Sequence, residues 1–202
     1  MLRVPSGESG NFAGNRAELT EAIRAFRPEN EQEEADKKGI LAFLAANENA
    51  FTRDNIIAHM TASAWVVNRD RTKVLMVYHR IYDSWSWTGG HADGEENLLA
   101  VALREVTEET GVRNVTPVSK DIFSLEILTV DGHEKHGSYV PSHLHMNVTY
   151  LLEADEEEPL TVCEDENKGV AWFGLDEALS ASSEPWFVQR IYRKLNEKLR
   201  KL

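Results

Sequence analysis

The stretch Gly90–Val112 (GHADGEENLLAVALREVTEETGV) constrains this chain more than any other part of its sequence. Its second half predicts a helix over Glu96–Glu109, because apolar residues recur there at the spacing of a single helix face. That apolar face consists of Leu99, Ala102, Leu103 and Val106. Three carboxylates follow on an adjoining face of the helix, namely Glu105, Glu108 and Glu109. The stretch therefore predicts a helix with one buried side and a cluster of negative charge beside it.

Carboxylates this close repel one another unless a cation binds between them. Hard divalent cations such as Mg²⁺ and Mn²⁺ prefer oxygen ligands of this kind. The preceding segment, Trp87–Gly94, is rich in glycine, which permits tight turns and lets a main-chain carbonyl approach a metal ion. Arg104 stands directly before Glu105 and has the side chain to hold a carboxylate by a forked contact. Taken alone, the glutamates also fit a simpler interpretation, an ordinary exposed helix face.

The same stretch resembles the Nudix box, G-x5-E-x7-R-E-U-x-E-E-x-G-U with U aliphatic, at every specified position. Those positions are Gly90, Glu96, Arg104, Glu105, Val106, Glu108, Glu109, Gly111 and Val112. The resemblance implies a Nudix hydrolase of the mixed α+β class. Its expected architecture is a Nudix-like α/β/α sandwich with a mixed central sheet, in which the box forms a loop–helix–loop that holds divalent metal at a diphosphate.

By this resemblance the catalytic carboxylates are Glu105, Glu108 and Glu109. The implied cofactor is magnesium, Mg²⁺, or else Mn²⁺, bound by these three side chains together with the carbonyl of Gly89. The resemblance further assigns structural support of the box to Gly90, Glu96, Arg104 and Gly111.

Metal ions at a diphosphate neutralise its oxygens and lower the pKa of a bound water, whose proton a carboxylate then takes. Nudix proteins differ in which glutamate acts as this base. Glu105 is the candidate within the box. Glu164 and Glu166, just before Val170–Phe173, are candidates from a later loop, although a solvated acidic loop is the favoured explanation for them.

The rest of the chain predicts one domain over residues 58–202, preceded by an extension over residues 1–57. The extension begins with a Gly/Ser/Asn-rich segment, residues 1–16, expected to be poorly ordered, and continues with two helices, 17–26 and 29–46. The sequence leaves three roles open for these helices, namely covering the substrate cleft, mediating a homodimer and extending the core. Strands are predicted at Thr61–Val67, Lys73–His79, Ile122–Val130, His143–Leu152 and Val170–Phe173, with later helices near Leu175–Leu179 and from Pro185 onward.

Charge and cysteine content limit the possible partners. The chain has 22 Lys+Arg against 34 Asp+Glu, a net charge of −12, which argues against nonspecific nucleic-acid binding. No apolar run approaches the length of a membrane span, and the N-terminus lacks a signal-peptide core. Cys163 has no internal partner for a disulfide, which fits a reducing compartment. We therefore expect a cytoplasmic protein whose partner is a small-molecule diphosphate.

Histidines are the most distinctive feature outside the box. His143, His145 and Asn147 alternate on one face of a predicted strand. His143 and His145 have three interpretations: contacts to a phosphate or base, a polar and partly exposed strand face, or a zinc site. The zinc interpretation lacks an accompanying cysteine or metalloprotease spacing. His91, inside the box loop, is positioned to touch a phosphate.

The favoured substrate is a nucleoside diphosphate derivative, X-P-P-nucleoside. The alternatives are a non-nucleotide diphosphate, such as a prenyl diphosphate, and a non-catalytic nucleotide-sensing module, against which the intact glutamates weigh. The proline typical of ADP-ribose pyrophosphatases is replaced by Ile127. The tyrosine typical of dinucleoside polyphosphate hydrolases is also missing, because Thr129 and Val130 occupy that region.

Overall fold

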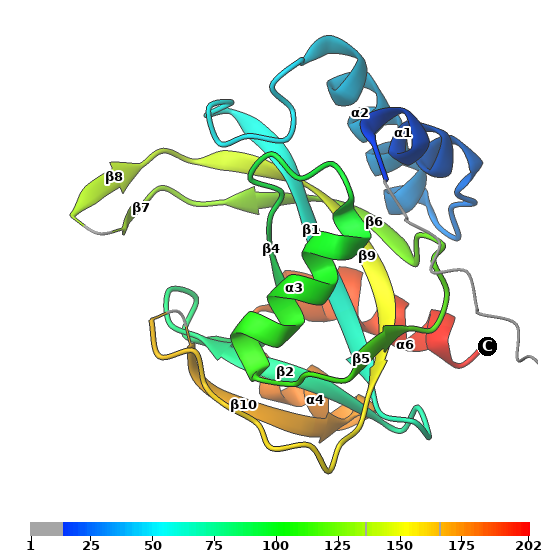
Figure 1. The fold of residues 1–202 in the computed structure, drawn as a ribbon, viewed down its shortest axis with the longest axis vertical. Coiled ribbons are helices and arrows are strands. Elements are labelled where there is room, and N and C mark those ends of the chain that lie inside the picture. The colour runs from blue at the N-terminus through cyan, green and yellow to red at the C-terminus, as the bar shows by residue number, and fades with distance from the viewer. Residues whose placement is uncertain (1–13, 136, 166) are drawn as a thin grey trace, which may run out of the picture.

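The computed structural model describes residues 14–135, 137–165 and 167–202, and its centre is an eight-stranded mixed sheet flanked by helices (Figure 1). The strands are β1 (Ala58–Val67), β2 (Lys73–His79), β3 (Ser84–Ser86), β4 (Thr88–His91), β5 (Val115–Pro117), β6 (Ser124–Val130), β7 (His133–Lys135), β8 (Ser138–Val140), β9 (His143–Ala154) and β10 (Asn167–Gly174). The helices are α1 (Arg16–Ala25), α2 (Glu31–Ala46), α3 (Leu98–Thr110), α4 (Leu175–Ala181), α5 (Pro185–Phe187), the π-helical turn η1 (Val188–Tyr192) and α6 (Arg193–Leu199). Most of the expected poorly ordered start falls on residues 1–13, outside the described residues.

The sheet has the order β10-β2-β1-β9-β5, with β3 on β2, β4 on β1 and β6 on β9. β1 and β9 run parallel from Ala58 opposite Leu144 to Val67 opposite Glu153, and the other pairings in this sheet are antiparallel. The mixed sheet predicted from the sequence is therefore confirmed.

β1 is buried along its whole length because helices cover both of its faces (Figure 1). Met60 and Ala62 pack in the hydrophobic cluster that contains Val106 of α3. Trp65 belongs to the cluster on the other side and stacks on Tyr192 at 5.4 Å between ring centroids. Alternate residues of a strand point to opposite faces, so this division places α3 and the C-terminal helices on opposite sides of the sheet. The expected layered sandwich is present.

The two N-terminal helices extend the core. Asn15 and Asn30 cap them by accepting hydrogen bonds from backbone amides of the first turn. Ile40 and Leu44 of α2 are buried in the cluster that contains α3. The acidic first turn of α2 is not wholly exposed to solvent, because Glu33 is fully buried. The proposed division of the chain at residue 57 remains a prediction.

Residues 131–142, between the strands predicted at Ile122–Val130 and His143–Leu152, form more than a polar loop. The segment contains a two-stranded hairpin in which His133 of β7 pairs with Val140 of β8. The hairpin extends away from the sheet between β6 and β9 (Figure 1).

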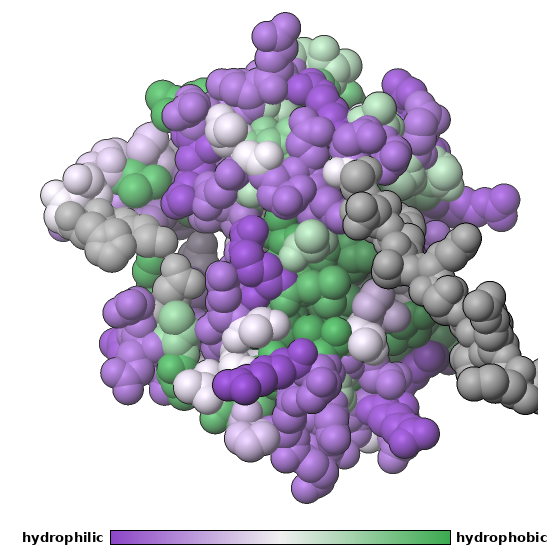
Figure 2. All heavy atoms as spheres, viewed as in Figure 1, coloured by the Kyte–Doolittle hydropathy of each residue, from purple (hydrophilic) through white to green (hydrophobic). Residues whose placement is uncertain are grey.

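No helix within the described ranges is long and apolar enough to cross a membrane. In Figure 2, hydrophilic residues border an apolar area near the middle of the face that α3 covers.

Candidate active site

The box adopts the expected turn–helix–turn. Asn97 caps α3, its side-chain oxygen accepting a 3.1 Å hydrogen bond from the amide of Ala100. Gly111 ends the helix with φ of +76°, a left-handed conformation that favours glycine. Glu96 accepts a 2.8 Å hydrogen bond from the backbone amide of Arg16, which ties the box to α1.

The three box glutamates lie in different environments, although the sequence predicts one shared face. Side-chain exposure is 60% for Glu108 and 13% for Glu105. Glu109 is only 4% exposed. Arg104 braces the middle of the site: its Nη2 donates to Glu105 Oε1 at 2.8 Å and to the carbonyl of His91 at 3.2 Å. The hydrogen bond to Glu105 uses one nitrogen only, so the expected fork is a single contact here.

Glu109 is held from two sides. Its Oε2 accepts a 2.9 Å hydrogen bond from the amide of Gly89, and its Oε1 accepts a 3.4 Å hydrogen bond from Asn167 Nδ2. Asn167 is buried at the start of β10. Asn167 was not among the residues predicted from the sequence, because it lies 58 residues beyond Glu109 and only its position after the acidic loop signals it.

Gly90 allows Glu105 to approach the backbone of β4. A Cβ atom at Gly90 would lie 2.3 Å from the carboxyl carbon of Glu105 and 2.4 Å from its Oε2. No side chain fits this space unless the carboxylate moves. The glycine of the motif thus shapes the cradle in which a carboxylate oxygen sits against the loop.

The residues present fit a divalent cation. The candidate ligands are carboxylate oxygens of one helix and a main-chain carbonyl, the donor set that Mg²⁺ and Mn²⁺ favour. The cradle at Gly90 holds one of these carboxylates in place. Glu105, Glu108, Glu109 and the carbonyl of Gly89 are therefore the groups that would hold the metal.

The acidic loop before β10 lies along the end of α3. The amide of Thr161 donates a 2.7 Å hydrogen bond to the carbonyl of Thr110, and Asn167 contacts Glu109. Glu164 lies between these two anchors and is exposed. Glu166, the other candidate base of this loop, lies outside the described residues.

Histidines from three strands meet at one end of the sheet. The structure brings His91, His143 and His145 together with His59, and we call these four residues the histidine cluster. His133 lies instead in the β7–β8 hairpin. Burial, aided by the neighbouring imidazoles, lowers the pKa of His145 to about 2. Burial likewise lowers the pKa of His59.

His59 was not predicted as a site residue, although it stands two residues before a predicted strand and thus on the face of Thr61. Its neighbour His145 becomes evident only from the parallel register of β1 and β9. His143 is buried, so the interpretation of its strand face as partly exposed holds only for His145.

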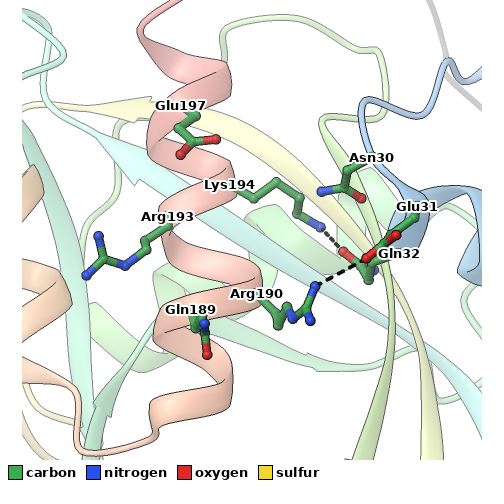
Figure 3. Close-up of a pocket in the computed structure, with 8 residues that line it drawn as sticks. All are labelled: Asn30, Glu31, Gln32, Gln189, Arg190, Arg193, Lys194 and Glu197. Atoms are coloured by element: carbon green, nitrogen blue, oxygen red, sulfur yellow. Dashed lines mark hydrogen bonds and ion pairs between the residues drawn. The ribbon is translucent and has the colours of Figure 1, made fainter.

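A separate cleft of about 380 Å³ lies between the C-terminal helical segment and the start of α2 (Figure 3). Figure 3 shows Lys194 directed toward Gln32 and Arg190 toward Glu31, at 2.8 Å and 3.6 Å. The cleft is lined by polar and charged side chains and shares no residue with the box. Two of its cationic groups, Lys194 and Arg190, contact α2, which is consistent with a contact between helices.

Comparison with known proteins identifies the family of this chain. Residues 58–195 match the family described as NUDIX domain, so the chain belongs to the Nudix hydrolase family, as the box predicts. The chain is 30% identical over 95 residues to the asymmetrical bis(5'-nucleosyl)-tetraphosphatase of Rattus norvegicus, and 28% identical over 95 residues to that of Mus musculus. Each match covers 46% of this chain and 58% of the relative.

Solved structures share the fold at lower sequence identity. An Ap4A hydrolase of C. elegans, solved as a binary complex, matches with a TM-score of 0.53 and 18% identity over 71% of this chain and 98% of that chain. The dihydroneopterin triphosphate pyrophosphohydrolase of E. coli matches with a TM-score of 0.50 and 14% identity, over 71% of this chain and 96% of that chain. These likenesses support the mixed sheet with flanking helices.

Proposed function

We propose that this protein is a divalent-metal-dependent hydrolase that cleaves a diphosphate linkage in a nucleotide derivative by attack of an activated water. The observation that carries the proposal is the box geometry, in which Glu105 and Glu109 are each fixed against β4, the strand that contains Gly89. A sensor module would not need carboxylates held this closely, so the intact site favours an enzyme.

A bound Mg²⁺ or Mn²⁺ would neutralise the diphosphate and lower the pKa of the attacking water. The protein contributes the positions of its own groups. The amide of Gly89 fixes one oxygen of Glu109, and Arg104 fixes Glu105 through Oε1. Held in this way, these carboxylates do not have to reorganise in order to act.

Two carboxylates are candidates for the base that takes the proton of water. Glu105 lies within the box, beside Arg104. Glu164 extends from a loop tethered at both ends to α3. A ligand and a base respond differently to substitution, because loss of a base lowers kcat by about 10²–10⁴-fold with little change in metal affinity. We therefore propose to compare Glu105→Gln with Glu164→Gln by kcat and by the Mg²⁺ concentration at half-maximal rate.

The substrate we favour is X-P-P-nucleoside, and dinucleoside polyphosphates are the first members to test. Two curated relatives are named for that activity, although the local tyrosine expected of it is absent at Thr129 and Val130. A prenyl diphosphate is the alternative substrate.

The single thiol, Cys163, is unpaired, so we infer a reducing, cytoplasmic setting. A homodimer remains a prediction for size-exclusion chromatography.

The deciding experiment measures phosphate and pyrophosphate release with and without Mg²⁺ or Mn²⁺. The panel contains dinucleoside polyphosphates, nucleoside triphosphates, ADP-ribose, nucleotide sugars and prenyl diphosphates, with Glu105→Gln as the blank. Metal-dependent release from one nucleotide group, lost in the variant, would establish the hydrolase and its substrate class. Release from prenyl diphosphates alone would replace the nucleotide assignment. Silence across the panel with metal still bound would contradict the proposal and favour a sensor.

A further inference from the structure

The histidine cluster has the arrangement of a second metal site. One nitrogen from each of His59, His91, His143 and His145 lies within 4.8 Å of the others. Ring centroids are 4.9–5.1 Å apart for the pairs His59–His143 and His59–His145. Tetrahedral zinc with four nitrogen ligands at its usual bond length requires ligand atoms roughly 3.3 Å apart. The Nε2 atoms of His143 and His145 are already 3.1 Å apart.

Two of these imidazoles have their outer nitrogens fixed by the backbone. His59 Nδ1 lies 3.1 Å from the carbonyl oxygen of Asn55, and His143 Nδ1 lies 2.8 Å from that of Pro141. A carbonyl oxygen only accepts, so Nδ1 must carry the proton in both rings. Each Nε2 then has its lone pair directed toward the cluster. Metal-binding histidines are held in this way, with the second nitrogen donating to a carbonyl.

His59 supplies an independent indication. The residue is 4% exposed, and its Nε2 has no hydrogen-bond partner among the residues that the structure describes. A buried polar atom without a partner in the protein is costly, and in native structures such an atom commonly binds a water molecule or an ion. Because Nδ1 of His59 is bound to the backbone, Nε2 is the nitrogen left to act in the group of four, which suggests a ligand common to the four histidines.

His91 lies in the box loop, but the cluster and the box use different ligand groups, and the other histidines lie further along the sheet. His59 lies on β1 at the level of His145, whereas Gly89 pairs with Ser63 four residues further along β1. Four residues of strand correspond to about 13 Å. Imidazole nitrogens suit Zn²⁺, Cu²⁺, Fe²⁺ or Ni²⁺, whereas carboxylate and carbonyl oxygens suit Mg²⁺ and Mn²⁺. The two donor sets therefore select different ions.

We propose that the histidine cluster binds one transition-metal ion, Zn²⁺ in the first instance, at a site separate from the carboxylates of the box. The ion would join β1, β4 and β9 near the base of the β7–β8 hairpin (Figure 1). Since His91 ends β4, the bound ion would also hold the strand that contains Gly89 and Gly90. This inference does not depend on the proposed hydrolysis.

The test is Zn²⁺ binding to the full chain after removal of metals with a chelator, measured by calorimetry and metal analysis in excess Mg²⁺. The excess Mg²⁺ occupies the carboxylates of the box. We expect one Zn²⁺ per chain, and Co²⁺ in its place should show the strong visible absorption of a tetrahedral site. His59→Asn and His145→Asn should each weaken Zn²⁺ binding by at least about 100-fold, more than the loss typical of an outer-shell partner. His133→Asn, in the hairpin, is the matched control and should leave affinity unchanged.

A variant of the box separates this proposal from the hydrolase. Glu109→Gln should retain the bound Zn²⁺, whatever its effect on Mg²⁺-dependent turnover. The zinc site is refuted if the wild-type chain takes up no stoichiometric Zn²⁺, or if Glu109→Gln removes it while the histidine variants keep it. Should a histidine variant fail to fold, the Co²⁺ spectrum of the wild-type chain still decides, because octahedral oxygen ligation gives only weak absorption.

Discussion

The amide of Gly89 donates a 2.9 Å hydrogen bond to Oε2 of Glu109, the last glutamate of the box. The residue whose carbonyl is the expected metal ligand thus binds the side chain of another expected ligand. The contact joins β4 to the final turn of α3. As a result, the loop and the helix that would hold the metal are fixed relative to one another.

Glu109→Gln should abolish Mg²⁺-dependent turnover without unfolding the protein. The amide oxygen of glutamine can still accept from Gly89, and its shape fills the same buried space. The lost charge removes a metal ligand, so activity should fall by more than the 10–100-fold typical of an outer-shell partner. Steady-state rates and thermal unfolding measure the two effects. Glu95→Gln makes the same change in the exposed box loop and serves as control. Near-normal turnover of Glu109→Gln would refute the ligand assignment.

Gly90→Ala should impair activity through Glu105. The added methyl would lie 2.3 Å from the carboxyl carbon of Glu105, so that carboxylate must leave its position. We expect a large fall in kcat together with a higher Mg²⁺ requirement, and only a small change in thermal stability. Gly169→Ala is the control, because its Cβ would lie no closer than 3.2 Å to the ring of Trp85, away from the box. Equal activity losses in the two variants would argue against a role of Gly90 at the site.

Asn167→Ala tests a positioning residue that the box motif does not contain. Asn167 contacts Glu109 Oε1 and lies at the end of the acidic loop. Its removal should raise the Mg²⁺ concentration at half-maximal rate by about 10–100-fold, the usual effect of losing a partner of a metal ligand. The KM for substrate at saturating Mg²⁺ should change little. Asn114→Ala, at an exposed asparagine bound to Glu158, is the matched control. Rescue by Asn167→Gln would support positioning, whereas a fall in stability alone would argue against it.

The sequence predicts those features that short-range patterns encode. Box spacing predicted α3 and its final turn at Gly111, and alternation predicted most of β1, β2, β6 and β9. The family was recognised from the same spacing. Short strands such as β4 and β5 were missed, because three or four residues give little periodicity and derive their structure from pairing.

Features that depend on long-range register could not be predicted. The histidine cluster needs the alignment of His59 with His145, 86 residues apart in the chain and defined only by the parallel pairing of β1 and β9. Glu33 similarly has the pattern of a solvated helix start. Glu33 can be buried as a charged group because Lys198, far along the sequence, contacts it at 2.5 Å and compensates its charge. Helix periodicity cannot indicate which lysine of the C-terminal segment turns inward.

Glu33 should make stability depend on pH. Burial raises its pKa, but the amide of Glu29 and the ammonium of Lys198 more than compensate, so the pKa lies below the usual 4.5 of a glutamate. As pH falls, Glu33 therefore takes up a proton at a higher pH in the unfolded chain than in the folded protein. The stabilisation is complete above about pH 4.5 and is lost as pH falls through the folded-state pKa. Urea unfolding of the wild type and Glu33→Gln should show a weaker acid dependence in the variant. As the control, Glu34→Gln at an exposed side chain should leave the acid dependence of stability almost unchanged.

Lys198→Met should be among the most destabilising substitutions. Lys198 and Glu33 are 6% and 0% exposed, and loss of the lysine removes the closer of two cations from a buried carboxylate; Lys194 Nζ remains 3.5 Å away. Breaking a buried pair from one side typically costs about 3–5 kcal/mol. The double variant Lys198→Met with Glu33→Met should recover much of this loss, because it leaves no charge unpaired at that position. Urea unfolding of both single variants and the double variant measures the coupling, and exposed Lys201→Met provides the control. Additive losses in the double variant would show that the two groups do not act as a pair.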